Sequence, residues 1–204
     1  MKRLKILQLF ALVVLVTLAG PDAQTAAADG AQTTVKEMIK SLKAFHHQKP
    51  LTPEQQKANA AQADKTLGFL DVQQVSERAL GKHWKHISPK EQKEFVTLLG
   101  NLFKVVAFPN SSKFFGEMKI TYGTVEQEGR TATVPLTVLH AEEGEVGLDF
   151  ILEDQNSRWR VVDVVLDGVS MRNNLRLQFY KVLKKNDFAE LVRRMQKKLK
   201  EESN

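Results

Sequence analysis

The apolar positions of the chain follow a helical period first, a strand period next and a helical period again. Apolar residues recur at spacings of three and four over residues 35–45, 72–80, 89–106 and 171–199, and the segment 53–67, rich in Gln and Ala, is also predicted to be helical. Between them, four consecutive stretches predict strands: 118–125, then 131–140 and 146–152, in which alternate positions are apolar, and 159–165, which is apolar at nearly every position and should be covered on both faces. This order is typical of an α+β protein. We therefore predict a four-stranded antiparallel sheet covered by the N- and C-terminal helices.

Two short motifs predict where helices begin. Thr52 stands before Pro53, and Ser88 stands before Pro89 with Glu91 three residues after the serine. A hydroxyl side chain can accept a hydrogen bond from the first turn, and proline at the first helical position loses no useful donor. The Ser88 motif has the spacing of a capping box. We expect helices to start at both prolines.

Two further prolines predict interruptions. Pro109, followed by the polar residues 110–112, indicates the end of the helix that begins at residue 89. Pro135 lies inside the second predicted strand and cannot donate to a neighbouring strand. A proline in such a run indicates a sheet edge or a bulge.

The N-terminus has the pattern of an export signal. Lys2, Arg3 and Lys5 precede an apolar run over residues 6–20, and three alanines end at Ala28. A basic start, a short apolar segment and small residues before a cleavage site are the parts of a secretory signal peptide. The run is shorter than the roughly 20 residues that span a bilayer. We predict a signal peptide over 1–28 and a single domain over 29–204, with an uncleaved anchor as the alternative.

Composition limits the chemistry that the protein can perform. The chain has 204 residues, of which 42% are hydrophobic and 26% charged, as is typical of one globular domain. It contains no cysteine, which excludes disulfides, thiolate metal ligands and a cysteine nucleophile. The length is sufficient for a hydrophobic core without such crosslinks.

The formal charge of +6 favours acidic partners in principle. Part of this charge lies on one polar face of the last predicted helix, formed by Arg193, Arg194, Lys197, Lys198 and Lys200. The face is interpreted either as an ordinary solvated surface or as a docking surface for an anionic membrane or an acidic partner. Aromatic residues are not interleaved with these cations, so we do not expect nucleic-acid binding.

Candidate catalytic and metal-binding groups are few. His83 and His86 could share a helical face, but they lack the partner residues and spacing of known zinc helices. Asp149 and Asp163 lie on predicted strands, where a buried carboxylate can act as a general base. The sequence has no phosphate-binding glycine loop and no nucleophile motif. We expect no metal, no cofactor and no catalytic residue, and an enzyme remains a lesser alternative.

Three segments resemble the MlaC-like family, also called the toluene-tolerance family of periplasmic auxiliary proteins. The most specific is 159–171 (WRVVDVVLDGVSM), which continues to Asn174, Arg176, Gln178 and Phe179. The others are 80–84 (LGKHW) with the residues that follow it to Phe95, and 129–134 (GRTATV). The resemblance extends from about residue 35 to about residue 199. The family usually has tyrosine where Leu175 stands and near Val105 and Val106, and here these positions are apolar.

The resemblance implies a cone-like fold with an apolar cavity and a role in lipid transport. Members of the family hold phospholipid acyl chains non-covalently in the cavity and carry the lipid across the periplasm. Their membrane partners are an outer-membrane lipoprotein complex and an inner-membrane ABC transporter, and the pathway maintains the lipid asymmetry of the outer membrane. We therefore expect a monomeric periplasmic lipid carrier that is not an enzyme. The alternatives are a hopanoid-associated branch of the family and a non-lipid interaction module with a filled core.

The apolar positions supply candidates for the cavity wall. We predict that the lipid-binding residues are Phe95, Leu99, Phe103, Val106, Val134, Leu136, Phe150, Leu152, Val164, Met171 and Leu175. Each of them could equally belong to a packed core. Gly168 and Ser170 are expected to shape and cap the turn into the following helix, and Asp163 to accept hydrogen bonds from the backbone or from Arg176.

Overall fold

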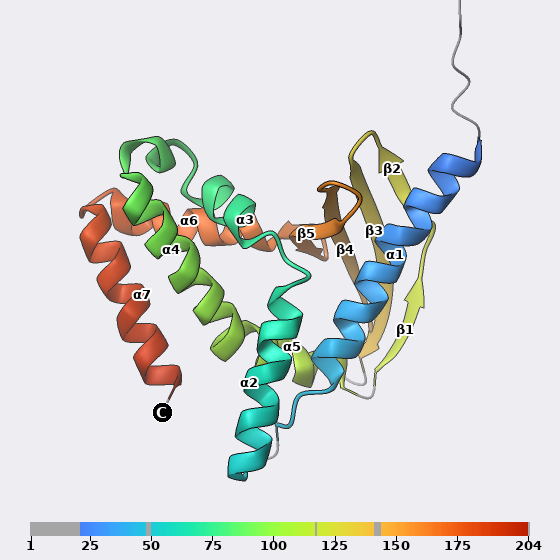
Figure 1. The fold of residues 1–204 in the computed structure, drawn as a ribbon, viewed down its shortest axis with the longest axis horizontal. Coiled ribbons are helices and arrows are strands. Elements are labelled where there is room, and N and C mark those ends of the chain that lie inside the picture. Colours follow the sequence, from blue (N-terminus) through green and yellow to red (C-terminus); the bar gives the residue numbers. More distant parts are fainter. Residues whose placement is uncertain (1–20, 48–49, 117, 141–143, 204) are drawn as a thin grey trace, which may run out of the picture.

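The computed structural model describes residues 21–47, 50–116, 118–140 and 144–203. In Figure 1 a sheet, with the long helix α1 lying across it, forms one half of the molecule, and α3, α4, α6 and α7 form the other. The helices α2 and α5 lie between these halves. The α+β class is as predicted.

The helices begin largely where the caps predict. They are α1 (Pro21–Lys43), α2 (Pro53–Leu67), α3 (Val72–Leu80), the 3₁₀ helix η1 (Gly81–His86), α4 (Pro89–Leu102), the π-helical segment η2 (Phe103–Ala107), α5 (Phe108–Phe115), α6 (Met171–Leu183) and α7 (Phe188–Glu202). Thr52 and Ser88 each form a capping box, with Gln55 and Glu91 respectively. Ser170 caps α6 by accepting a hydrogen bond from the N–H of Asn173.

Within the described residues the sheet has six strands, so the prediction of four is wrong. The strands are β1 (Lys119–Tyr122), β2 (Glu126–Glu128), β3 (Thr131–His140), β4 (Gly144–Asp154), β5 (Trp159–Leu166) and β6 (Val169–Ser170). All paired strands are antiparallel, in the order β1-β3-β4-β5-β6, and β2 also pairs with β3. The additional strands are short: β6 follows the turn at Gly168, whose φ of 81° needs a residue without a side chain.

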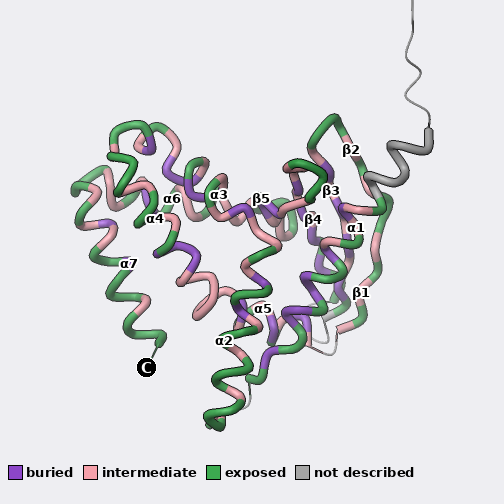
Figure 2. The backbone as a smooth tube through the Cα atoms, viewed as in Figure 1, coloured by how far each residue is buried: buried purple, intermediate pink, exposed green. Residues whose placement is uncertain are grey.

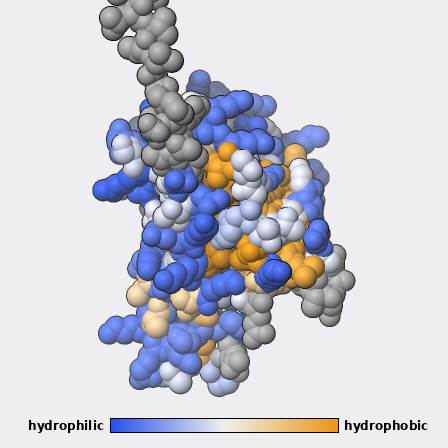
Figure 3. All heavy atoms as spheres, turned by 90° about the vertical axis from the view of Figure 1, so that its right-hand side faces the viewer, coloured by the Kyte–Doolittle hydropathy of each residue, from blue (hydrophilic) through white to orange (hydrophobic). Residues whose placement is uncertain are grey.

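Pro135 explains why the first predicted strand is two strands. Both β1 and β2 pair with β3, one on either side of Pro135. At the proline, the N–H of Gly123 donates to the Pro135 carbonyl at 2.8 Å, and no proline N–H exists to return the bond. The edge of the sheet is therefore interrupted here. Figure 3 shows the molecule from this side, where hydrophilic residues cover most of the surface and hydrophobic ones gather in its central part.

Two hydrophobic cores hold the molecule together. The first lies between α1 and the sheet, where alternate residues of β3 and β4 face each other, as in the pairs Val134 with Phe150 and Leu136 with Leu148. The second lies among α3, α4, α6 and α7 and is centred on Phe95. Figure 2 shows the buried backbone concentrated along α1 and the central strands and along the inner sides of the other helices. Phe103 packs against both cores.

Pro109 does not end the helical stretch, contrary to the prediction. The segment Phe103–Ala107 adopts the wider π-helical geometry, in which the N–H of Phe108 donates to the carbonyl of Phe103. This change of register makes Pro109 one of the first residues of a new helix, where its missing N–H costs little. Residues 110–112 are therefore helical and not a loop.

The predicted signal peptide falls mainly outside the described residues. Of its 28 positions, 1–20 are not described, and the remainder belongs to the start of α1. The buried residues of α1 begin at Ala31. Signal peptide and cleavage after Ala28 therefore stay predictions. None of the helices in the described part of the chain is both long and apolar enough to cross a membrane.

Candidate functional site

A pocket of about 370 Å³ lies where the two cores meet. It is lined by α1, β4, β5, η2, α5 and the first turns of α6, together with Leu70 and Val75. All but four of the lining residues are apolar, and the four exceptions are Asn110, Ser111, Asp163 and Arg172. Such a wall offers dispersion contacts and few hydrogen bonds, which suits an apolar ligand.

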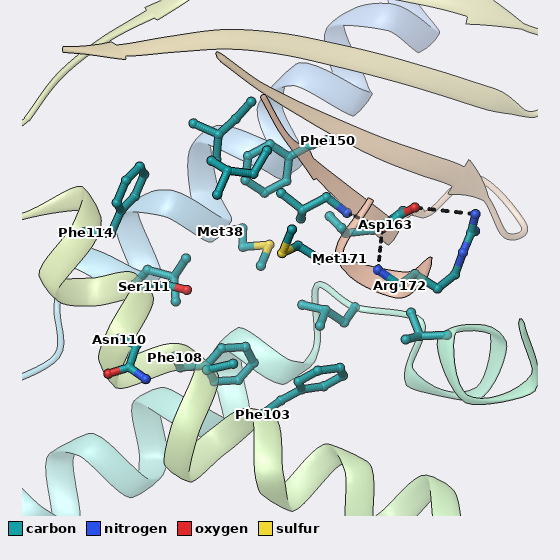
Figure 4. A pocket seen from close by; sticks show the side chains of 18 of the residues that line it. Met38, Phe103, Phe108, Asn110, Ser111, Phe114, Phe150, Asp163, Met171 and Arg172 are labelled. Carbon is teal, nitrogen blue, oxygen red and sulfur yellow. Dashed lines mark hydrogen bonds and ion pairs between the residues drawn. The ribbon is translucent and has the colours of Figure 1, made fainter. Parts of the chain in front are cut away.

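Figure 4 shows how the polar groups are distributed around the pocket. Asn110 and Ser111 lie on one side, on α5, together with Phe114. Asp163 and Arg172 lie on the other side, next to the sheet and the start of α6. The side chain of Met38 lies between these two polar groups. The pocket therefore has an apolar interior and two separate polar margins.

Five of the predicted lipid-binding residues line the pocket. They are Phe103, Phe150, Val164, Met171 and Leu175. They come from four elements that the sequence places far apart, since η2, β4, β5 and α6 converge here. Their contact with lipid stays a prediction.

The other six predicted residues do not line this pocket. Val134, Leu136 and Leu152 are buried in the core between the sheet and α1. Phe95 and Leu99 are buried in the helical core, where the ring of Phe95 lies 5.5 Å from that of Phe179. Val106 belongs to the π-helical segment but is not a lining residue. An alternating or helical apolar pattern predicts burial, and it does not distinguish a core from a cavity wall.

The sequence prediction missed the contribution of α5 and α1. Ser111 and Phe114 line the pocket from α5, where the sequence pattern predicts a break after Pro109. Met38 and Leu42, one helical turn apart, line it from α1. The spacing of Met38 and Leu42 was visible in the sequence, but nothing in the sequence showed which sheet residues this stripe would face.

Asp163 organises the strand-to-helix connection at one margin of the pocket. Its carboxylate accepts hydrogen bonds from the N–H of Val164 at 2.9 Å, the N–H of Arg172 at 3.0 Å and the hydroxyl of Ser170 at 2.6 Å. The guanidinium of Arg172 lies 3.4 Å from the same carboxylate. The expected backbone bonds are therefore present, and the arginine partner is Arg172 instead of Arg176.

These contacts give Asp163 a structural role. Its side chain is only 4% exposed, and both carboxylate oxygens are occupied by donors of the protein itself. A general base needs an oxygen that can reach a substrate proton. Asp149, the other candidate, does not line the pocket.

The histidine pair also has a different environment from a metal site. The ring of His83 packs edge-on against Tyr180, with 4.9 Å between ring centroids. Burial lowers the pKa of His83, and the nearby charges of Lys82 and His86 lower it further. In the described residues, no group of three or more His, Asp or Glu side chains could hold a metal ion.

An α+β fold with an apolar pocket between a sheet and a helical half defines the structural class. The sequence model of the MlaC protein family matches residues 32–197, and the chain belongs to this family. The resemblance seen in the sequence is thereby confirmed. Among curated proteins, no match to this chain was found.

A solved structure has a similar fold. It is the phospholipid-binding protein from Ralstonia solanacearum in complex with a phospholipid, to which this chain is 16% identical. The TM-score is 0.69, and the similarity covers 87% of this chain and 99% of the other. At this identity the comparison establishes the fold.

Proposed function

We propose that the protein is a periplasmic carrier that holds the acyl chains of a phospholipid in the pocket between its two cores. The observation that carries this proposal is the pocket wall, in which only four lining residues are polar. Membership of the MlaC family supports it, as does the phospholipid bound by the protein from Ralstonia solanacearum that shares this fold.

A carrier of this kind solves a physical problem. Each methylene group withdrawn from water is worth about 0.8 kcal/mol, so two long acyl chains represent on the order of 20 kcal/mol of transfer free energy. A lipid that leaves a bilayer needs an apolar enclosure for its chains. This task requires no nucleophile, metal or cofactor.

The pocket has to widen before it can hold two acyl chains. Its volume of about 370 Å³ is at the lower end of the roughly 300–1,000 Å³ of ligand pockets. We propose that the two cores move apart when both acyl chains enter. The segment Phe103–Ala107 supports such a movement, because its π-helical geometry interrupts the regular helix where the cores meet.

The proposed route connects two membranes. The carrier would exchange lipid with an outer-membrane lipoprotein complex and with an inner-membrane ABC transporter, and would reach the periplasm through the signal peptide proposed for residues 1–28. This assignment rests on the family.

Lipid transfer between vesicles tests the proposal. Donor vesicles carry a self-quenched fluorescent phospholipid, and the protein should increase the rate at which fluorescence appears in acceptor vesicles. Ser111→Trp should abolish this increase, because Ser111 lines the pocket and a tryptophan there would occupy it. Lys113→Trp is the matched control, since Lys113 is exposed on the same helix and does not line the pocket. If transfer is no faster with the wild-type protein than without it, the proposal is wrong.

A further inference from the structure

Arg176 lies in a closely packed site on the helical half, away from the pocket lining. The guanidinium of Arg176 stacks over the ring of Tyr180, with 5.9 Å between Cζ and the ring centroid. The N–H of Lys82 donates to the Tyr180 hydroxyl at 3.2 Å, and the ring of His83 packs edge-on against the same tyrosine. We call Lys82, His83, His86, Arg176 and Tyr180 the Arg176 cluster.

Gly81 allows this close packing. It has a φ of 51°, which side chains rarely tolerate. A Cβ atom at this position would lie 2.6 Å from the Tyr180 hydroxyl and 2.7 Å from Nη2 of Arg176. The arginine is therefore held against the backbone at the start of η1, in a fixed position and not as a freely moving surface side chain.

The positive charge of the cluster has no counterion in the described part of the chain. No carboxylate there lies within 4.0 Å of Arg176, Lys82, His83 or His86. The Nε atom of Arg176 is buried and has no hydrogen-bond partner. By contrast, Arg193 and Arg194 of α7 both pair with Glu190. A fixed, partly buried and unpaired guanidinium is costly by itself and gains most from an anion brought by a partner.

The residue types also suit a protein interface. Arginine and tyrosine are enriched among the residues that contribute most to binding between proteins. Leu177, which follows Arg176 in α6, is 70% exposed, the highest value among the exposed large hydrophobic residues of the described chain. A cation with an aromatic neighbour and an adjacent exposed leucine offers both charge and apolar contact.

We propose that the Arg176 cluster is a docking site for an acidic segment of a protein partner, whose carboxylates bind Arg176 between α6 and η1. A carboxylate side chain can project toward the half-buried arginine, whereas the phosphates of a flat bilayer would first meet the exposed Lys82. The observations therefore favour an acidic protein segment over an anionic membrane. The site is independent of what the pocket holds.

Binding of an acidic peptide to the full chain tests this proposal. The probe is a short fluorescein-labelled peptide of alternating glutamate and serine, titrated at low ionic strength and followed by fluorescence anisotropy. Arg176→Gln should weaken binding about tenfold, as expected for a partly buried charge pair. Lys82→Gln removes an exposed charge and should weaken it about threefold. Lys57→Gln on α2 changes the net charge equally and should have no comparable effect, because Lys57 is exposed and α2 lies apart from α6 and η1 (Figure 1).

The controls separate specific docking from general charge attraction. If Lys57→Gln weakens binding as much as Arg176→Gln does, the attraction is unspecific and the proposal is wrong. If Arg176→Gln unfolds the protein, Lys82→Gln decides, because it disturbs no buried group. Absence of peptide binding by the wild-type protein overturns the proposal. The proposal is also wrong if the protein binds phosphatidylglycerol vesicles in an Arg176-dependent way but does not bind the peptide.

Discussion

A charge placed on the pocket wall should strongly lower the lipid affinity, and the same charge on an exposed face of the same helix should not. Leu175 and Leu177 lie on the same helix, α6. Leu175 lines the pocket, and Leu177 is 70% exposed. The variants Leu175→Glu and Leu177→Glu therefore differ in location but not in chemistry.

The expected magnitude follows from the contacts that Leu175 would make. A leucine side chain fully buried by a ligand contributes about 1.5–3 kcal/mol, and a carboxylate held against an acyl chain adds a desolvation cost of several kcal/mol. Taking about 3 kcal/mol as a lower bound, Leu175→Glu should lower lipid affinity at least about a hundredfold. Leu177→Glu should change the binding free energy by less than about 0.5 kcal/mol.

The assay is titration of each purified variant with a fluorescent phospholipid, after circular dichroism and a thermal melt have shown that the variant is folded. Leu175→Ala serves as a milder second variant, because Leu175 also packs beside the helical core. Its affinity should fall only several-fold. Unchanged lipid affinity in folded Leu175→Glu would refute the assignment of the pocket.

Three further predictions concern the framework around the site. Asp163→Asn should lower the free energy of unfolding by about 1–3 kcal/mol in denaturant melts, because an amide cannot accept all the hydrogen bonds that this carboxylate accepts. It should reduce the lipid affinity less than Leu175→Glu does. A loss of lipid affinity as large as that of Leu175→Glu would contradict the structural role of Asp163. Gly81→Ala should destabilise the fold by about 1–3 kcal/mol, because the Cβ of the alanine would meet the hydroxyl of Tyr180. An unchanged melting temperature would count against that contact. Hydrogen bonds from Arg193 and Arg194 lower the pKa of Glu190 from 4.5 to about 2. The stability that these pairs add to α7 should therefore be present above pH 4.5 and be lost as the pH falls toward 2. Glu190→Gln should remove this part of the acid dependence of helicity, measured by circular dichroism at low salt, and an identical acid profile would show that the pairs contribute nothing.

The elements of the fold were predictable where a local pattern decides them. The alternation over 131–140 corresponds to β3, and the caps at Thr52 and Ser88 start α2 and α4. Pro135 predicted a sheet edge or a bulge, but its effect on the neighbouring strand was not predicted. Its missing N–H splits the neighbouring edge into β1 and β2, and the strand count changes for that reason.

The site was less predictable than the fold because it is formed by convergence of distant segments. Phe103 and Val106 lie in the same helical stretch, yet only Phe103 lines the pocket. The π-helical segment rotates the chain that follows it, and this brings Ser111 to the pocket wall. A regular helical period cannot predict such a rotation, since it assumes one register throughout.

The central claim is that the protein carries a lipid, and native mass spectrometry of the protein purified from the cells that make it tests this most directly. We predict a complex with one lipid per chain, from which extraction yields a diacyl phospholipid. A bound polycyclic lipid would support a carrier of a different lipid class. A protein that is empty, and that takes up no phospholipid from added vesicles, would contradict the claim.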